Sequence, residues 1–364
     1  MPQGTKECKD EAIWPYATNF IKNYKRIGEK SKTFFKYSVA KEAAFVVLYI
    51  YGIPLFLERE QGGPSGDGAL RNLFRRRNGA LIMSAAKRNM FAEGEFGQYI
   101  DVDGLNVHYY EEGYGTPVIF IHGIGQSIYT FRNNIEDFAA CFRVIVPDLM
   151  GHGSTDGSES DYLIEDYSEF LLSFMNALNI DSANIVGFST GGVIAMDFSL
   201  AFPERVKKLV LLSPGGPTEH YPSQIRNMTI PIISDISFIA FSRNTIRNIL
   251  NTAYFDKTLV TDETVDVYYE FLHNKYCRDA VYTTLNNWDD SEVHENMGAL
   301  SCPIYIFWGE NDEWNPLEYL ETFEDAIPNV YAATVRNGGH MLHEEKYREI
   351  NRKAIELLLT DEIV

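Results

Sequence analysis

Three residue types that together can activate a hydroxyl group occur in this chain, each within three residues of a glycine and after an apolar segment. A serine hydroxyl is a weak nucleophile at neutral pH, so it needs a histidine base that is itself oriented by a carboxylate. Ser189, Asp312 and His340 supply these groups, and they follow one another in the order serine, acid, histidine. The pattern predicts acyl transfer with Ser189 as the nucleophile.

Ser189 is expected on a sharp turn between a strand and a helix. An apolar run, residues 183–186, precedes the sequence Gly-Phe-Ser-Thr-Gly-Gly, and a helical pattern, residues 193–201, follows it. Such a turn forces the serine into a strained backbone conformation, which is tolerated only where its neighbours lack bulk. The three glycines of this sequence meet that requirement.

The base and the acid each have a neighbour that could take the same role. His340 and His343 both follow the last expected strand, and His340 is favoured because it lies directly after the strand. Asp312 is favoured over Glu310 because it lies further from the end of its strand, past a glycine turn. It therefore has more reach toward the far nitrogen of the histidine.

An oxyanion that forms during attack by Ser189 requires two N–H donors aimed at the place where the charge develops. Thr190, directly after the nucleophile, is expected to supply one from the start of its helix. Ile124, which follows the apolar run 118–121 and has a glycine on each side, is expected to supply the other. His122 is expected to tether loops and not to take part in catalysis.

Alternating strands and helices must position these residues. The expected strands are 99–102, 105–111, 118–121, 143–146, 183–186, 206–212, 304–308 and 331–335, and the first two form a hairpin across Asp103 and Gly104. The expected helices between and after them are 129–139, 162–178, 193–201, 317–326 and 347–359. This alternation is typical of a mostly parallel sheet with helices on both faces.

The chain divides into three regions. Residues 96–216 and 301–364 carry the alternating pattern, whereas residues 217–300 are mostly helical and rich in aromatic residues, which predicts an inserted helical cap, or lid. Residues 1–95 form an extension that is expected to be mainly helical, and it includes a basic helical pattern at 69–90.

Five motifs together resemble those of the α/β-hydrolase superfamily. They are HGIG (122–125), PDLMGHGSTD (147–156), GFSTGG (187–192), WGENDEWNP (308–316) and GGHMLHEE (338–345), and each follows an expected strand. The resemblance covers residues 99–359 and implies the α/β-hydrolase fold, with an eight-stranded, mostly parallel sheet and the chain order serine, acid, histidine. It also implies structural roles for Asp148, Gly151, His152, Gly153 and Asp156. The extension, residues 1–95, has no counterpart in this pattern.

The favoured function is hydrolysis of a carboxylic ester, thioester or lactone of an apolar small-molecule acyl substrate through an acyl-enzyme on Ser189. A serine at this position disfavours epoxide hydrolysis and dehalogenation, for which that superfamily uses an aspartate. The predicted cap is similar to the caps of meta-cleavage hydrolases and esterases, so hydrolysis of a carbon–carbon bond stays open. Acyl transfer or cyclisation, and a hydrolase-fold receptor or scaffold, are further alternatives. No cofactor and no metal ion are expected.

Composition restricts the partners and the compartment. The formal net charge of −19 disfavours nucleic acid, because phosphates would be repelled. Residues 1–90 hold 16 Lys and Arg against 8 Asp and Glu, whereas residues 91–364 hold 16 against 43, so the extension is basic and the remainder acidic. Four widely spaced cysteines indicate neither a disulfide framework nor a zinc site, which favours a cytoplasmic protein.

The extension contains an uncharged run of 15 residues, 43–57. As a helix it would be about 22 Å long, short of the roughly 30 Å hydrocarbon core of a bilayer. The run is therefore expected to pack on the rest of the chain or on a partner protein, or to lie on a membrane surface as a peripheral association. Oligomerisation is left open.

Overall fold

The computed structural model describes residues 97–215, 242–328 and 330–360. The predicted extension, with its apolar run 43–57 and its basic pattern 69–90, lies outside these residues, as does the first part of the predicted cap. What the sequence indicates for those parts stays a prediction. Among the residues that the structure does describe, no helix has both the length and the apolarity needed to cross a bilayer.

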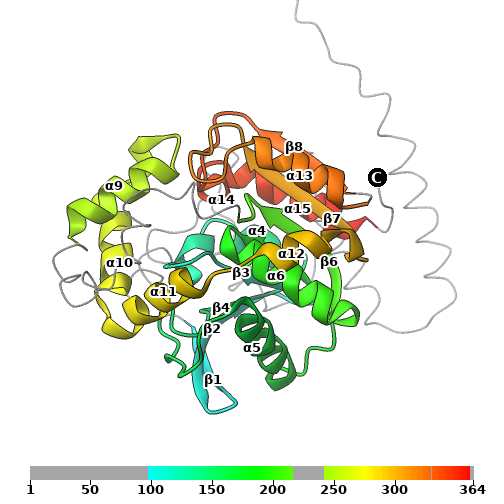
Figure 1. Ribbon diagram of the computed structural model, residues 1–364, viewed down its shortest axis with the longest axis horizontal. Coiled ribbons are helices and arrows are strands. Elements are labelled where there is room, and N and C mark those ends of the chain that lie inside the picture. The colour runs from blue at the N-terminus through cyan, green and yellow to red at the C-terminus, as the bar shows by residue number, and fades with distance from the viewer. Residues whose placement is uncertain (1–96, 216–241, 329, 361–364) are drawn as a thin grey trace, which may run out of the picture. The chain divides into compact units, whose positions relative to one another are not determined.

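The centre of the described chain is an eight-stranded sheet with the order β1-β2-β4-β3-β5-β6-β7-β8 (Figure 1). Its strands are β1 (Gln98–Val102), β2 (Leu105–Glu112), β3 (Pro117–Ile121), β4 (Arg143–Pro147), β5 (Ala183–Phe188), β6 (Val206–Leu212), β7 (Ile304–Gly309) and β8 (Val330–Val335). β2 pairs antiparallel with β1 and β4, and all other pairs are parallel. The predicted α/β-hydrolase sheet is confirmed.

Helices cover the sheet and connect its strands. They are α4 (Ile135–Ala139), α5 (Ile164–Ala177), α6 (Thr190–Ala201), α9 (Arg243–Ala253), α10 (Asp262–His273), α11 (Lys275–Asn287), α12 (Ser291–Asn296), α13 (Glu318–Ala326), α14 (Leu342–Glu345) and α15 (Tyr347–Leu359). Short 3-10 turns are η1 (Ile128–Phe131), η2 (Pro203–Arg205), η5 (Lys257–Leu259) and η6 (Met297–Ala299). Helices α9, α10 and α11 form a group beside the sheet (Figure 1) and lie in the segment predicted to be a cap.

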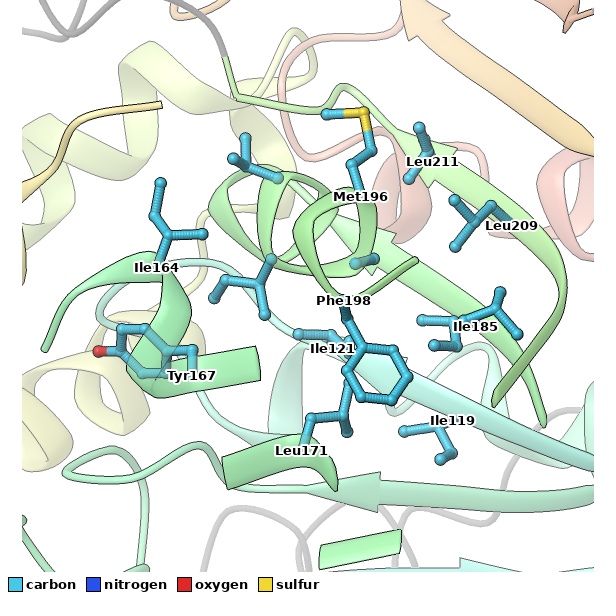
Figure 2. Packing of buried hydrophobic residues seen from close by; sticks show 14 of the residues in the cluster. Ile119, Ile121, Ile164, Tyr167, Leu171, Ile185, Met196, Phe198, Leu209 and Leu211 are labelled. Atoms are coloured by element: carbon cyan, nitrogen blue, oxygen red, sulfur yellow. The ribbon is translucent and has the colours of Figure 1, made fainter. Parts of the chain in front are cut away.

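Alternate residues of the central strands face the two sides of the sheet, as strand geometry requires. On one side, Ile119, Ile121, Ile185, Leu209 and Leu211 pack against α5 and α6 in a single buried cluster, with Leu171 of α5 and Phe198 of α6 among their partners (Figure 2). On the other side, Phe120 makes edge contacts with Phe131 and Phe138. Burial on both faces explains why these strands read as continuous apolar runs.

One predicted helix is interrupted. The sequence predicts a continuous helix over 129–139, but the structure has the 3-10 turn η1 and the short helix α4 with a break between them. At the break, the side chain of Asn134 is buried and donates to Asn351 Oδ1 at 2.7 Å and to the carbonyl of His343 at 3.2 Å. Helical periodicity does not report these long-range hydrogen bonds, so the sequence pattern does not predict the break.

Candidate active site

The backbone at Ser189 has the strained conformation that the sequence predicts. β5 ends at Phe188, α6 begins at Thr190, and Ser189 between them has φ 53° and ψ −125°. A non-glycine residue in this region is held there by its surroundings at an energetic cost. The result is a serine side chain that stands at the end of a strand and at the start of a helix.

The glycines around Ser189 are required by close backbone contacts. A Cβ atom on Gly191 would lie 2.4 Å from the carbonyl oxygens of both Ile121 and His122, and one on Gly187 would lie 2.6 Å from the carbonyl oxygen of Gly191. Backbone atoms cannot move away as a flexible side chain can. The sequence Gly-Phe-Ser-Thr-Gly-Gly therefore permits α6 to pack directly on the end of the sheet.

The structure brings the predicted serine, histidine and acid together in a hydrogen-bond chain. Nε2 of His340 lies 3.0 Å from Ser189 Oγ, and Nδ1 of His340 lies 2.9 Å from Asp312 Oδ2. All three residues are buried. With a proton on Nδ1, His340 donates to the carboxylate and accepts from the serine hydroxyl, which is the arrangement of a general base and its orienting acid.

The second carboxylate oxygen of Asp312 is fixed by its own loop. Oδ1 accepts the backbone N–H groups of Trp314 and Asn315, each at 2.9 Å. The Asn315 side chain in turn donates to the carbonyls of Ser213 and Pro214, beyond the end of β6. The acid is thus held by two neighbouring strand ends, and its orientation does not depend on His340 alone.

The two competing residues lie elsewhere. His343 is fully buried, but its Nε2 is 2.7 Å from Thr130 Oγ1, and burial lowers its pKa to about 3, so it is neutral. Glu310 is exposed and accepts a hydrogen bond from Thr334. Neither residue is hydrogen-bonded to Ser189 or His340, so the geometry favours Asp312 and His340 over these alternatives.

The predicted oxyanion donors also lie beside Ser189, with one difference from the expectation. The N–H of Thr190 is at the first position of α6, where a helix offers no internal acceptor. The N–H of Ile124 donates to Thr190 Oγ1 at 2.8 Å. The sequence pattern predicts a role for the backbone of Thr190 only, and the hydroxyl of Thr190 is an additional polar group of this site.

Trp314 is a second residue that sequence reasoning missed. Its ring is stacked on that of His340, with centroids 5.0 Å apart and planes at 20°, and its Nε1–H donates to Thr252 of α9 at 2.9 Å. Trp314 lies two residues after Asp312 in the motif WGENDEWNP (308–316). Its contact with His340 depends on the packing of the loop after β7 against the loop after β8, which the sequence pattern does not report.

Ser189 and His340 line an open cavity of about 670 Å³, a volume that includes the solvent at its mouth. The helices of the predicted cap segment supply one wall: Ile246, Ile249, Leu250 and Ala253 of α9, Tyr268 and Leu272 of α10, and Val281 and Leu285 of α11. No Lys, Arg, Asp or Glu is present among the described lining residues. The described walls of the cavity are therefore mostly apolar and carry no carboxylate, ammonium or guanidinium group.

A buried ion-pair cluster joins these helices to the rest of the fold. Glu344 accepts hydrogen bonds from Arg132 at 2.5 Å, from Tyr254 at 2.7 Å, from Thr130 at 3.0 Å and from Tyr268 at 3.3 Å. Burial alone would raise the pKa of Glu344, but the charge and hydrogen bonds of Arg132 outweigh burial and lower it. Glu344 is thus a buried carboxylate paired with a buried cation.

His122 has the tethering role that was expected. Its Nδ1 lies 2.8 Å from the carbonyl of Gly123, and its Nε2 accepts the N–H of Leu149 at 3.0 Å, so the ring joins the loops after β3 and β4. Burial lowers its pKa and keeps it neutral. The described part of the chain contains no group of three His, Cys, Asp or Glu side chains that could hold a metal ion.

Comparisons with known proteins identify the family of this fold. A family model described as the alpha/beta hydrolase fold matches residues 116–231. The chain is 28% identical over 274 residues to a 2-hydroxy-6-oxo-6-phenylhexa-2,4-dienoate hydrolase of Comamonas testosteroni, a match that covers 71% of this chain and 93% of that protein.

Solved structures show the same similarity. The meta-cleavage product hydrolase CumD of Pseudomonas fluorescens superposes with a TM-score of 0.63 and 26% identity, over 72% of this chain and 98% of that chain. An enol-lactonase of Burkholderia xenovorans shares the fold, with a TM-score of 0.60 and 16% identity, over 72% of this chain and all of that one. The chain is a member of the α/β-hydrolase superfamily.

Proposed function

We propose that the protein is a serine hydrolase that cleaves an ester, thioester or lactone of a neutral, apolar acyl substrate through an acyl-enzyme on Ser189. The observation that carries this proposal is the hydrogen-bond chain Ser189–His340–Asp312, which opens on an apolar cavity. Similarity to named hydrolases over most of their length supports hydrolysis as the reaction.

The proposed reaction follows from the positions of these groups. Ser189 Oγ attacks the carbonyl carbon while His340 Nε2 takes the hydroxyl proton, and the carbonyl electron pair moves onto oxygen as the oxyanion. Asp312 stabilises the imidazolium, and the N–H of Thr190 at the start of α6 donates to the oxyanion, while the Ile124 N–H beside it is bonded to Thr190 Oγ1 in this structure. His340 then protonates the leaving group. Water, deprotonated by the same nitrogen, attacks the acyl-enzyme; the bond from Ser189 Oγ to the acyl carbon then breaks, His340 returns the proton to Ser189 Oγ, and the acid is released.

Charge is the property of the cavity that separates the two candidate substrates. The relative from Comamonas testosteroni is named for a dienoate, which is a carboxylate. A carboxylate that leaves water needs a compensating cation or several donors, since an unpaired buried charge is costly. The described lining residues include no Lys or Arg. This favours a neutral acyl group over an anionic one.

Carbon–carbon bond hydrolysis is the second candidate function, and the relatives' names are the observation in its favour. A direct competition decides between the two. We expect p-nitrophenyl esters of medium chain length to have a higher kcat/KM than a 2-hydroxy-6-oxo-dienoate. A higher value for the dienoate would overturn the ester proposal and leave the nucleophile unchanged.

Labelling with a fluorophosphonate probe tests the nucleophile itself. We expect the folded wild-type protein to be labelled and the Ser189→Ala variant to remain unlabelled. Ser213→Ala is the matched control: Ser213 lies at the end of the adjacent strand β6, is fully buried, and its hydroxyl has no partner among the described residues. Loss of labelling in the control, or labelling that persists without Ser189, would contradict the assignment.

A further inference from the structure

The hydroxyl oxygen of Thr190 accepts a hydrogen bond from one of the two backbone N–H groups that are predicted to bind the oxyanion. Ile124 follows β3 and Thr190 opens α6, yet the Ile124 N–H donates to Thr190 Oγ1 at 2.8 Å. Thr190 is 3% exposed. The residue before it, Ser189, and the residue that donates to its hydroxyl, Ile124, both line the cavity. An oxygen atom of the chain thus lies where a donor of the oxyanion hole points.

The hydroxyl proton of Thr190 has no hydrogen-bond acceptor among the described residues. A threonine hydroxyl offers one donor and two acceptor positions, and the bond from Ile124 uses one acceptor position. No described group accepts the hydroxyl proton, although buried polar groups are nearly always paired. The backbone N–H of the same residue lies at the first position of α6 and has no intrahelical acceptor. Thr190 therefore carries two donors without an acceptor, next to the nucleophile.

We propose that the Thr190 hydroxyl is a donor of the oxyanion hole, acting in place of the Ile124 N–H that is bonded to it, and thus a catalytic residue of this enzyme. When the Oγ–carbon bond forms at Ser189 and the carbonyl electron pair moves onto oxygen, the Thr190 O–H rotates and donates to that oxygen. The proton stays on Thr190 throughout. Oγ1 continues to accept from Ile124, and a hydroxyl polarised in this way is a stronger donor than an isolated one.

The inference rests on the proposed acyl-enzyme function, and it assigns the side chain a role that the backbone argument alone does not. A threonine here does what a residue with an apolar side chain could not do, because its hydroxyl can accept from Ile124 and donate to an oxyanion at once. This role of the hydroxyl also explains how the site can function although the Ile124 N–H is already bonded to Thr190 Oγ1.

The test compares Thr190→Val, which has nearly the same shape without the hydroxyl, with Thr190→Ser, which keeps it. Removal of one oxyanion donor typically lowers kcat by about 10²–10³-fold. Because the backbone N–H of residue 190 is retained and the Ile124 N–H is released by the substitution, the loss should be partial, and we expect Thr190→Val to lower kcat for a p-nitrophenyl ester by roughly 10–100-fold with little change in KM. Thr190→Ser should stay within about threefold of the wild type.

A transition-state analogue separates catalysis from structure. A trifluoromethyl ketone, which forms a hemiketal oxyanion on the serine, should lose affinity for Thr190→Val in parallel with kcat/KM, because it uses the same donor. Thr190→Ala is the second hydroxyl-free variant, to be used if the valine does not fold. Thermal midpoints of all variants are measured so that kinetics are recorded well below unfolding.

The outcomes distinguish this inference from the proposed function. An active wild type with unchanged kcat in the hydroxyl-free variants overturns the role of Thr190 and leaves the nucleophile standing. An increase in kcat would also overturn it, because the hydroxyl would then be a plug that competes with the oxyanion. Failure of the fluorophosphonate to label wild-type Ser189 instead removes the acyl-enzyme function itself.

Discussion

Replacement of Glu344 by glutamine tests whether the buried ion-pair cluster holds the fold together. Glu344 and Arg132 are 2% and 11% exposed in their side chains, so neither charge is compensated by water. Glu344→Gln keeps the shape but leaves the Arg132 cation without its carboxylate. Removal of one member of a buried pair costs about 3–5 kcal/mol, because the remaining charge stays buried and unpaired.

The assay is the free energy of unfolding from urea or thermal denaturation. For a domain of 150–250 residues, each kcal/mol corresponds to a shift of roughly 2–4 °C in the midpoint, so the thermal midpoint should fall by about 10 °C. Tyr254, at the end of α9, and Tyr268 of α10 donate to different oxygens of Glu344, so replacing one oxygen by an amide nitrogen removes the acceptor of one of them. The loss should therefore also loosen the wall of the cavity and raise KM for an ester.

Glu111→Gln is the matched control. Glu111 forms the same kind of pair with Arg143, at 2.7 Å, but the two side chains are 26% and 28% exposed. Such a pair contributes at most about 1 kcal/mol. If Glu344→Gln is no less stable than Glu111→Gln, the buried cluster does not carry the stability assigned to it and the reasoning from burial is wrong.

The same cluster predicts the direction of a pH dependence. In the folded protein the pKa of Glu344 is lower than its ordinary value of 4.5. Between these two values the unfolded chain binds more protons than the folded one, so stability rises with pH. The contribution is complete above pH 4.5 and is lost as the pH falls through the folded-state value. The difference in unfolding free energy between wild type and Glu344→Gln should therefore shrink in acid.

Three further substitutions test the site. Asp312→Asn should lower kcat for an ester by about 10⁴-fold, because the amide no longer stabilises the required tautomer and the imidazolium. Glu310→Gln, on the same loop but exposed, should leave kcat within twofold of the wild type. Gly191→Ala should yield little folded protein by circular dichroism, since its Cβ would meet two carbonyl oxygens at 2.4 Å, whereas Gly157→Ala, with 3.5 Å available, should fold normally. Trp314→Leu should lower kcat by roughly tenfold through loss of the ring stacked on the histidine, while a phenylalanine at this position should retain most of the rate; equal rates for both variants would contradict a role for the ring.

Much of the fold follows from local pattern. The buried strands β3, β5 and β6 are continuous apolar runs, and the turn between β1 and β2 carries Asp103 at φ 52° and Gly104 at φ 90°, as a tight hairpin requires. The interrupted helix before β4 shows the limit of this reasoning. A helical period reports which residues are apolar, but it does not report that Asn134 is needed by residues more than 200 positions away.

The candidate site divides in the same way. Ser189 was found from its glycines, because the backbone of a strained turn restricts the residues on either side of it. Asp312 and His340 were found from their places after strands, because parallel strands bring their carboxyl ends to one edge. The Trp314 ring, the Thr190 hydroxyl and the Glu344 cluster were not found, since each depends on contacts between loops that are distant in the sequence.

Local sequence pattern is sufficient to predict the order of strands and helices along the chain, the strained turn at Ser189 and the residue types of the hydrogen-bond chain. These are consequences of side-chain period, glycine geometry and chain order, all of which are local. Only the tertiary structure decided which histidine nitrogen meets which oxygen, and that the Ile124 N–H is paired with Thr190. It also placed the carboxylate of Glu344 among Arg132 and two tyrosines. Whether a hydrogen bond or ion pair of this kind forms depends on differences of a few tenths of an ångström in the distance between its atoms. Packing sets these distances, and local sequence pattern does not report them.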